Sequence, residues 1–287
     1  MPNFLFMEKL NFFRNFLCAI CLMSASCLYA HGSLSKRIKE KTIEIGKHPK
    51  NAILYFERGF LYQQHEEFNK AIKDYLKSEK LGNSSNLLNY RKAQSYFKKN
   101  KFKQALEASK VYLKKDSVDV KINKLHAQIL IQLKDYQEAL KYYGYFINNT
   151  IDINPDDVIE YSQIYLALNS NDYPKALEVI QSGLNKLGKN TFALQLQKLE
   201  YLEASLKIEE AIEQYNYFIL STDRREFWYY NKAKYLFDNK RVEGSKIALQ
   251  QAKTAIVLLN EKFRNTLAIK KLQNEINTLE NKLSNEN

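Results

Sequence analysis

The 287-residue sequence predicts an all-α protein built from about six helix–turn–helix repeats and closed by a C-terminal helix. Two observations support this fold class. The chain has only 8 Gly and 4 Pro, and this scarcity of turn-forming residues favours long helices joined by short connections. An aromatic-x-x-Ala pattern also recurs about every 34 residues, which is a length typical of one helical hairpin.

The first 30 residues have the composition of a targeting segment. Lys9 and Arg14 precede an apolar stretch that ends in small residues, and this order resembles a secretory signal peptide. Three fates stay open: cleavage after Ala30, lipidation of Cys27 in a relaxed bacterial lipobox, and retention as an uncleaved membrane anchor. We expect the protein to be exported and periplasmic, either soluble or attached to the membrane through the lipid on Cys27 or the anchor.

The rest of the chain offers little catalytic chemistry. All three Cys precede residue 30, so no disulfide, thiolate metal site or catalytic Cys is expected beyond it. Phosphate-binding Gly-rich loops, HExxH and GxSxG are absent from the sequence. The histidines have no second ligand one helical turn away, and the paired carboxylates Asp156-Asp157 and Glu209-Glu210 suit helix starts. We therefore expect no enzyme, no cofactor and no metal.

The repeats follow one register. The first copy of the pattern is Phe68-Asn69-Lys70-Ala71, and the intervals to the next copies are 34, 34, 37, 35 and 34 residues. These residues resemble the tetratricopeptide repeat over 52–260. In that family the eighth and twentieth places are small, because the two helices of a repeat cross there. The eighth places are Gly59, Ala93, Ala127, Ile164, Leu199 and Ala233, and the twentieth are Ala71, Ala105, Ala139, Ala176, Ala211 and Ser245.

Two further helices are predicted beside the repeats. A leading helix is expected within 34–51, before the repeats at 52–260. Residues 261–287 contain no Gly or Pro, and their apolar stripe has 3-4 spacing: Ile269, Leu272, Ile276, Leu279 and Leu283. The stripe predicts a capping helix over the sixth repeat. A short coiled-coil seam for dimerisation is the alternative, although two heptads are few for a coiled coil.

The resemblance implies that the first helices of the repeats line a concave groove, at places two, five, nine and twelve. Candidate partner-binding residues at these places are Phe56, Phe60, Tyr90, Phe97, Tyr161, Tyr165, Phe227 and Tyr230. Aromatic residues are enriched in protein interfaces, although some of these side chains could instead pack against a neighbouring repeat. Phe56 and Phe60 occupy places where a family clamp for a peptide carboxylate has Lys and Asn, so an apolar segment suits the groove better.

A basic segment lies in the second repeat. Between Arg91 and Lys115 there are nine basic residues and one acid, Glu107. The predicted turn and the start of the following helix hold the basic patch: Lys98, Lys99, Lys101 and Lys103. The patch suits anionic lipid, envelope polymer or an acidic partner, and a plain solvated surface is the other interpretation. Nucleic acid is not an expected partner of an exported chain.

The sequence thus predicts a non-catalytic interaction scaffold of the bacterial cell envelope that binds a partner protein segment in an apolar Phe/Tyr groove. The alternative is a tether or receptor for anionic envelope polymer or lipid, which uses the basic second repeat and weakens steeply with salt. A third possibility, a membrane-anchored regulator facing the cytoplasm, requires an uncleaved N-terminus. The identity of the partner and the oligomeric state are left open.

Overall fold

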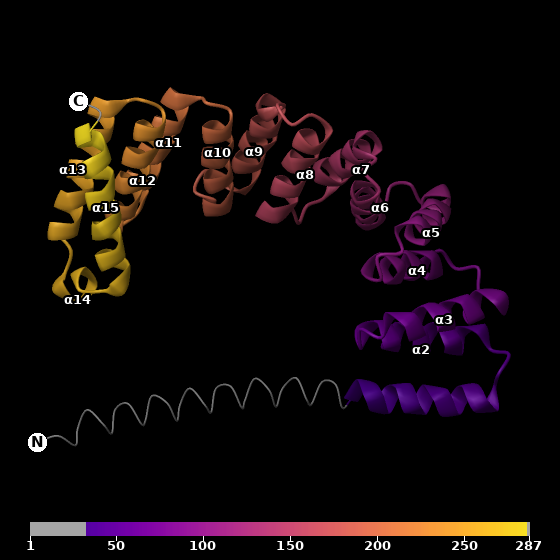
Figure 1. Cartoon of the computed structure of the whole chain (residues 1–287). Helices are drawn as coiled ribbons and strands as arrows, with labels where there is room; N and C mark the ends of the chain where they lie inside the picture. Colours follow the sequence, from indigo (N-terminus) through magenta and orange to yellow (C-terminus); the bar gives the residue numbers. More distant parts are fainter. Residues whose placement is uncertain (1–32, 286–287) are drawn as a thin grey trace, which may run out of the picture. The chain divides into compact units, whose positions relative to one another are not determined.

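The computed structural model describes residues 33–285, so the predicted targeting segment and Cys27 lie outside the described residues. Within this range every regular element is a helix, and successive helices pair into hairpins (Figure 1). The chain divides into two compact units, Met1–Thr150 and Ile151–Asn287. We call them the first and second units and describe each by itself. None of the described helices is long and apolar enough to cross a membrane.

The first unit holds a leading helix and three repeats. Residues 33–47 are helical, and the repeats are α2 (Ala52–Gln64) with α3 (Phe68–Lys80), α4 (Asn86–Lys98) with α5 (Phe102–Lys115), and α6 (Val120–Gln132) with α7 (Tyr136–Asn149). Arg58 on α2 ties the leading helix to the first repeat. Its guanidinium donates to Thr42 at 3.2 Å and to both carboxylate oxygens of Asp74 on α3 at 2.6 and 2.8 Å.

The second unit holds three more repeats and two terminal helices. They are α8 (Pro155–Leu168) with α9 (Tyr173–Leu187), α10 (Phe192–Ala204) with α11 (Ile208–Ser221), and α12 (Arg225–Asp238) with α13 (Val242–Val257), followed by α14 (Glu261–Arg264) and α15 (Leu267–Asn285). The N-terminus of α8 is stabilised by a capping box, in which Asn154 and Asp157 bond each other's backbone amides, and Pro155 lies between them as the first helical residue. The all-α prediction of six repeats with a capping helix is confirmed.

The two helices of a repeat approach closely where the sequence has small residues. A Cβ atom added to Gly59 would stand 2.8 Å from ring carbons of Tyr75 and 3.3 Å from the carbonyl oxygen of Ala71. The twentieth places Ala71, Ala105, Ala139, Ala176, Ala211 and Ser245 are all 0% exposed. The register predicts this crossing because larger side chains would push the backbones apart.

The turn inside each repeat is short, and in most repeats it contains one residue with left-handed backbone angles. Five non-glycine residues have φ between 55° and 63°, one in each of five turns: Glu66, Asn100, Lys134, Leu206 and Lys240. The fourth repeat differs, because its turn has four residues, 169–172, where the others have three. Its eleventh place, Ala167, departs from the family pattern, which has a large residue there.

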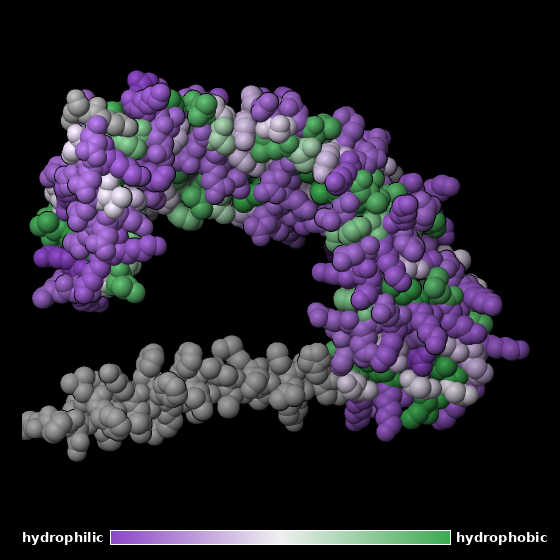
Figure 2. All heavy atoms as spheres, in the orientation of Figure 1, coloured by the Kyte–Doolittle hydropathy of each residue, from purple (hydrophilic) through white to green (hydrophobic). Residues whose placement is uncertain are grey.

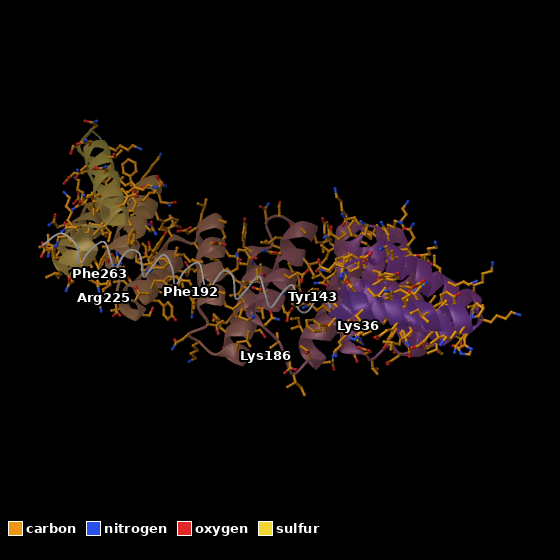
Figure 3. The ribbon with its side chains drawn as sticks, turned by 90° about the horizontal axis from the view of Figure 1, so that it is seen from below. Lys36, Tyr143, Lys186, Phe192, Arg225 and Phe263 are labelled. Carbon is orange, nitrogen blue, oxygen red and sulfur yellow. The ribbon has the colours of Figure 1, made fainter. Side chains whose placement is uncertain are left out.

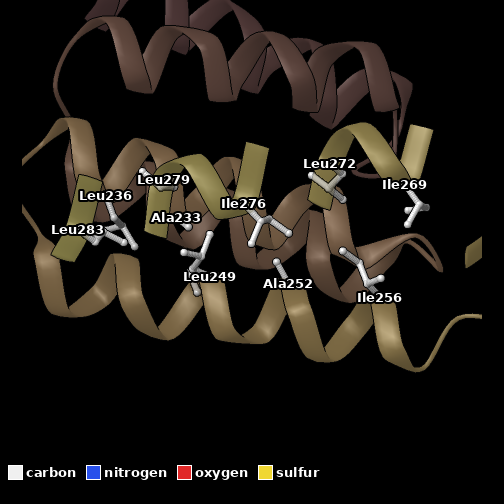
Figure 4. Packing of buried hydrophobic residues seen from close by; sticks show 11 residues of the cluster. Ala233, Leu236, Leu249, Ala252, Ile256, Ile269, Leu272, Ile276, Leu279 and Leu283 are labelled. Atoms are coloured by element: carbon white, nitrogen blue, oxygen red, sulfur yellow. The ribbon is translucent and has the colours of Figure 1, made fainter. Parts of the chain in front are cut away.

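The predicted single helix over 261–287 is two helices. Asn260 accepts a hydrogen bond from the Lys262 amide and starts α14, and Thr266 accepts from the Ile269 amide and starts α15. The apolar stripe of α15 is at most 5% exposed and packs on α13 and α12 (Figure 4). α15 therefore caps the sixth repeat, and its stripe is used inside the unit.

Candidate functional site

Four of the predicted partner-binding residues lie on the first helices of the first unit. Phe56 is on α2, and its ring centre lies 5.8 Å from that of Tyr75. Tyr90 and Phe97 on α4 stand 5.8 Å from Tyr112 and Phe102 on α5. Phe56, Tyr90 and Phe97 are half-buried, so each of these three rings packs partly on its own hairpin and keeps part of its surface accessible.

The fourth aromatic residue, Phe60, lies under an arginine. The guanidinium carbon of Arg91 on α4 is 4.4 Å from the Phe60 ring centre, a cation–π contact between adjacent repeats. Arg91 also donates to Gln94 at 3.1 Å, whereas its buried Nε atom has no partner within the described range. We call Phe56, Phe60, Tyr90, Arg91 and Phe97 the first-unit face.

A chain of hydrogen bonds connects the arginine of this face to the buried side chain of Tyr75 on α3. The buried hydroxyl of Tyr75 donates to Gln63 at 2.7 Å, and the Gln63 amide donates to Gln94 at 3.0 Å. Gln94 in turn accepts the bond from Arg91. The side chains of α3, α2 and α4 are thus linked in series, and this orders the arginine above Phe60.

The second unit presents its predicted residues differently. Tyr161 and Tyr165 on α8 are neighbours, with hydroxyl oxygens 3.2 Å apart, and burial together with this hydrogen bond raises the pKa of Tyr161. Phe227 and Tyr230 pack against the core cluster that α15 completes. The Arg224 guanidinium stands 5.5 Å from Phe227 and 5.4 Å from Phe263 of α14, which is labelled in Figure 3. These last two sites therefore border the capping helices.

The basic patch is fully on the surface. Lys98, Lys99, Lys101 and Lys103 are exposed, and none of them forms an ion pair with the residues that the structure describes. They belong to a wider asymmetry of charge. Residues 33–150 contain 24 Lys and Arg against 12 Asp and Glu, whereas residues 151–285 contain 18 of each. Hydrophilic residues dominate the visible face of the first two repeats (Figure 2).

A cleft of about 620 Å³ opens between α3, α4 and α5. Its lining includes the apolar Leu88, Tyr96 and Val111 together with Lys103 of the basic patch. Lys92 crosses it to bond both carboxylate oxygens of Glu79 at 2.7 Å. This cleft has no signature in the repeat register, because its walls come from two different repeats.

The histidine in the third repeat is structural. His126 is 3% exposed, and its Nδ1 atom lies 2.7 Å from the Ser109 hydroxyl. Burial lowers the pKa of His126 to about 4, and the Lys110 ammonium adds to the effect. In the part of the chain that is described, no cluster of three His, Cys, Asp or Glu side chains could hold a metal ion.

The fold is shared with known repeat proteins. The family described as "Anaphase-promoting complex, cyclosome, subunit 3" matches residues 47–146, which hold the first two repeats and most of the third. The C-terminal part of a TPR repeat-containing protein from Cytophaga hutchinsonii has a similar structure, with a TM-score of 0.61, 15% identity, and coverage of 80% of this chain and 93% of that one. The chain therefore has the fold of tetratricopeptide-repeat proteins.

Two further solved structures resemble this chain. One is a tetratricopeptide repeat protein from Parabacteroides merdae, with a TM-score of 0.53, 13% identity, and coverage of 85% of this chain and 93% of that one. The other is Naa15/Naa10 bound to HypK-THB, with a TM-score of 0.54, 14% identity, and coverage of 91% of this chain and 45% of that one. No curated protein matches the sequence.

The tetratricopeptide register places the candidate residues on the first helices but does not show what touches them. It places Phe56 and Phe60 on α2 and Tyr90 and Phe97 on α4, the first helices of two adjacent repeats. It does not reveal the contact between Arg91 and Phe60, because that contact joins residues 31 positions apart in adjacent repeats. The signal was present in part, since Arg91 belongs to the basic segment that the sequence analysis identified.

Proposed function

We propose that the protein is a non-catalytic interaction scaffold whose first-unit face binds an extended segment of a partner protein. The observation that supports this proposal is the half-buried aromatic set with the Arg91 guanidinium held over Phe60. Exposed aromatic rings and arginine are the side chains that most often dominate binding energy at protein interfaces. Naa15/Naa10, a structural neighbour, is recorded bound to HypK-THB, and a protein ligand agrees with that precedent.

The partner segment is expected to combine apolar and acidic residues. Apolar side chains would cover the exposed parts of Phe56, Phe60 and Tyr90. A carboxylate would complement the positive charge of the half-buried Arg91 guanidinium. The surplus of 12 positive charges in residues 33–150 favours the approach of such a segment.

The test selects 12-residue peptides from a random library on the full-length chain and measures the affinity of the best binder. We expect enrichment of apolar residues with Asp or Glu, and Phe60→Ala or Arg91→Gln should each weaken binding about tenfold or more. Lys99→Gln is the control, because it removes the same charge outside the face and should change affinity by less than about twofold. Equal affinity for Phe60→Ala and the unmodified protein would exclude this face.

We further propose that the protein works at the cell envelope after export. This part of the proposal is supported by the basic, apolar and small-residue order of residues 1–30. Mass spectrometry of the purified mature chain tests it. A first residue at His31, or a lipidated Cys27 as first residue, would support export. An unprocessed N-terminus in a cytoplasmic fraction would contradict it.

A second candidate function uses the basic patch to bind anionic lipid or envelope polymer. It is supported by four exposed lysines, Lys98, Lys99, Lys101 and Lys103, that make no ion pair within the described residues. Binding to phosphatidylglycerol vesicles should then fall steeply between low and physiological salt and be lost when all four become Gln. Peptide binding at the first-unit face should fall less with salt, because its contacts with the aromatic rings are not screened.

A further inference from the structure

The second unit contains a cleft of about 390 Å³ on its first helices. It lies between α10 and α12, and Tyr215 of α11 contributes to its lining. The apolar part of the lining includes Leu196 and Leu199 of α10. None of these residues belongs to the first-unit face.

The cleft has an excess of negative charge. Glu200, Glu203 and Asp238 line it together with a single ammonium group, that of Lys234. Asp238 accepts a hydrogen bond from Lys234 at 2.6 Å, and this bond raises the pKa of Lys234. The charge of Glu203 also acts on Lys234, but the three carboxylates of the cleft share this one ammonium group, and Glu200 and Glu203 form no ion pair among the described residues.

The two remaining carboxylates have uncharged neighbours. Glu200 accepts from the Gln197 amide at 2.8 Å, and Glu203 accepts from the Tyr215 hydroxyl. Each carboxylate oxygen can accept more than one hydrogen bond, so both groups keep free capacity. Their negative charge would be best complemented by a cation that also donates several hydrogen bonds.

One residue that lines the cleft also has a buried hydroxyl without a partner. Tyr235 of α12 is only 9% exposed, and its buried hydroxyl makes no hydrogen bond within the described range. Burial raises the pKa of this hydroxyl, so it is neutral and can both donate and accept. Leaving a buried polar group without a partner costs about 1–3 kcal/mol, and a ligand that reaches it would recover part of this cost.

An indole ring completes the lining. Trp228 stacks on Phe218 with ring centres 4.1 Å apart, and its ring centre lies 6.5 Å from that of Tyr215. Trp228 is half-buried and lines the cleft. Tryptophan is the aromatic side chain that attracts cations most strongly.

We propose that this cleft binds an arginine side chain of a partner protein. A guanidinium is planar, donates five hydrogen bonds and stacks on aromatic rings, so it matches two carboxylates, a hydroxyl oxygen and an indole better than a lysine ammonium does. The methylene stem of the arginine would lie against Leu196 and Leu199. The inference rests on the proposed function only in taking a protein segment as the ligand.

Tryptophan fluorescence of the full-length chain comes from this cleft alone, because Trp228 is the single tryptophan of the sequence. The experiment follows the Trp228 emission of the full-length chain during titration with acetyl-Ala-Arg-Ala-amide at constant ionic strength. We expect a saturable change with a Kd of about millimolar, about threefold weaker binding of the Lys peptide, and about tenfold weaker binding of the neutral citrulline peptide. No saturable change, or an equal response to citrulline, would overturn the proposal.

Variants assign the binding to named groups. Glu203→Gln should weaken the arginine peptide about tenfold, and Tyr235→Phe about threefold. Glu243→Gln on α13 is the control, since it removes one exposed carboxylate outside the cleft and should change affinity by less than about twofold. If circular dichroism shows that Glu203→Gln is unfolded, Glu200→Gln takes its place, and unchanged affinity in the folded variant refutes the assignment.

The same titration separates this proposal from the function proposed for the first-unit face. Phe60→Ala should leave the arginine response at Trp228 unchanged, whereas it should lose the selected peptide. An arginine response without peptide binding would support only the second-unit cleft. Peptide binding without an arginine response would refute the cleft and leave the first-unit face in place.

Discussion

The hydroxyl of Tyr75 donates a 2.7 Å hydrogen bond to the side-chain oxygen of Gln63. Tyr75 has the twenty-fourth place of the first repeat and Gln63 the twelfth. The same two places in the fifth repeat hold Tyr215 and Glu203, which are bonded in the same sense. This pair joins the end of a first helix to the middle of the second helix, and its buried hydroxyl needs that acceptor.

Removal of the Tyr75 hydroxyl should therefore destabilise the first unit. We expect Tyr75→Phe to lower the free energy of unfolding by about 1–2 kcal/mol, because the half-buried Gln63 loses its donor while the ring stays packed. Urea unfolding followed by circular dichroism measures the change. Tyr55→Phe is the control, since its hydroxyl bonds an exposed carbonyl of Pro49, and equal losses in both variants would contradict a special role for the buried pair.

The close crossing at Gly59 predicts a penalty for a single methyl group. Gly59→Ala should lower the free energy of unfolding by about 1–3 kcal/mol, because the new Cβ would stand 2.8 Å from the Tyr75 ring. Gly244→Ala on α13 is the matched control. Its Cβ would meet Leu236 at 3.4 Å, and higher helix propensity should leave it neutral or up to about 1 kcal/mol more stable. A stabilised Gly59→Ala variant would disprove the tight crossing.

The buried histidine predicts acid sensitivity. An unfolded chain binds a proton at His126 below about pH 6.5, whereas the folded chain does so only near pH 4. Stability from this residue is thus complete above about pH 7 and is lost as the pH falls towards 4, with about 2 kcal/mol lost by pH 5. Urea midpoints at pH 7 and pH 5 should differ less in His126→Gln. The exposed His48→Gln should keep the wild-type difference, and identical behaviour of the two variants would contradict this prediction.

The buried stripe of the capping helix predicts that shortening one of its apolar side chains lowers the free energy of unfolding substantially. Ile276 is 1% exposed within the cluster of α12, α13 and α15, so Ile276→Ala should cost about 2–4 kcal/mol in the second unit. Gln273→Ala, on the exposed side of α15, should change stability by less than about 0.5 kcal/mol. Light scattering should give the same mass for both variants. A dimer that dissociates in Ile276→Ala would support the coiled-coil alternative instead.

The sequence predicted the repeat order because each place has its own packing requirement. Small residues such as Ala71 and Ala105 mark helix crossings, and their spacing alone locates six hairpins. The break between α14 and α15 was missed, because Asn260 and Thr266 act as caps only once the chain reverses there. Capping depends on local geometry that a 3-4 apolar stripe does not encode.

The candidate sites were predictable only in part. The repeat register predicted the positions of Phe60 and Tyr230 on the first helices. It did not predict that Arg91 stacks on Phe60, or that Tyr230 packs against the hydrophobic cluster that α15 completes. Glu200 and Glu203 stood out only as acidic residues of one repeat. Their cleft depends on Tyr235, which belongs to the next repeat, so its chemistry emerges only when both helices are placed.

Five of the six hairpins reverse direction on a residue with left-handed backbone that is not glycine. A side chain in that conformation is strained by about 1–2 kcal/mol, and of the five residues only Asn100 is of a type that often adopts it. The packed helices must impose the reversal on the linker. The packing of the two helices in each hairpin therefore determines where the chain reverses, and the turn residues adopt the conformation that this packing requires. This explains how a chain with so few Gly and Pro can make so many reversals.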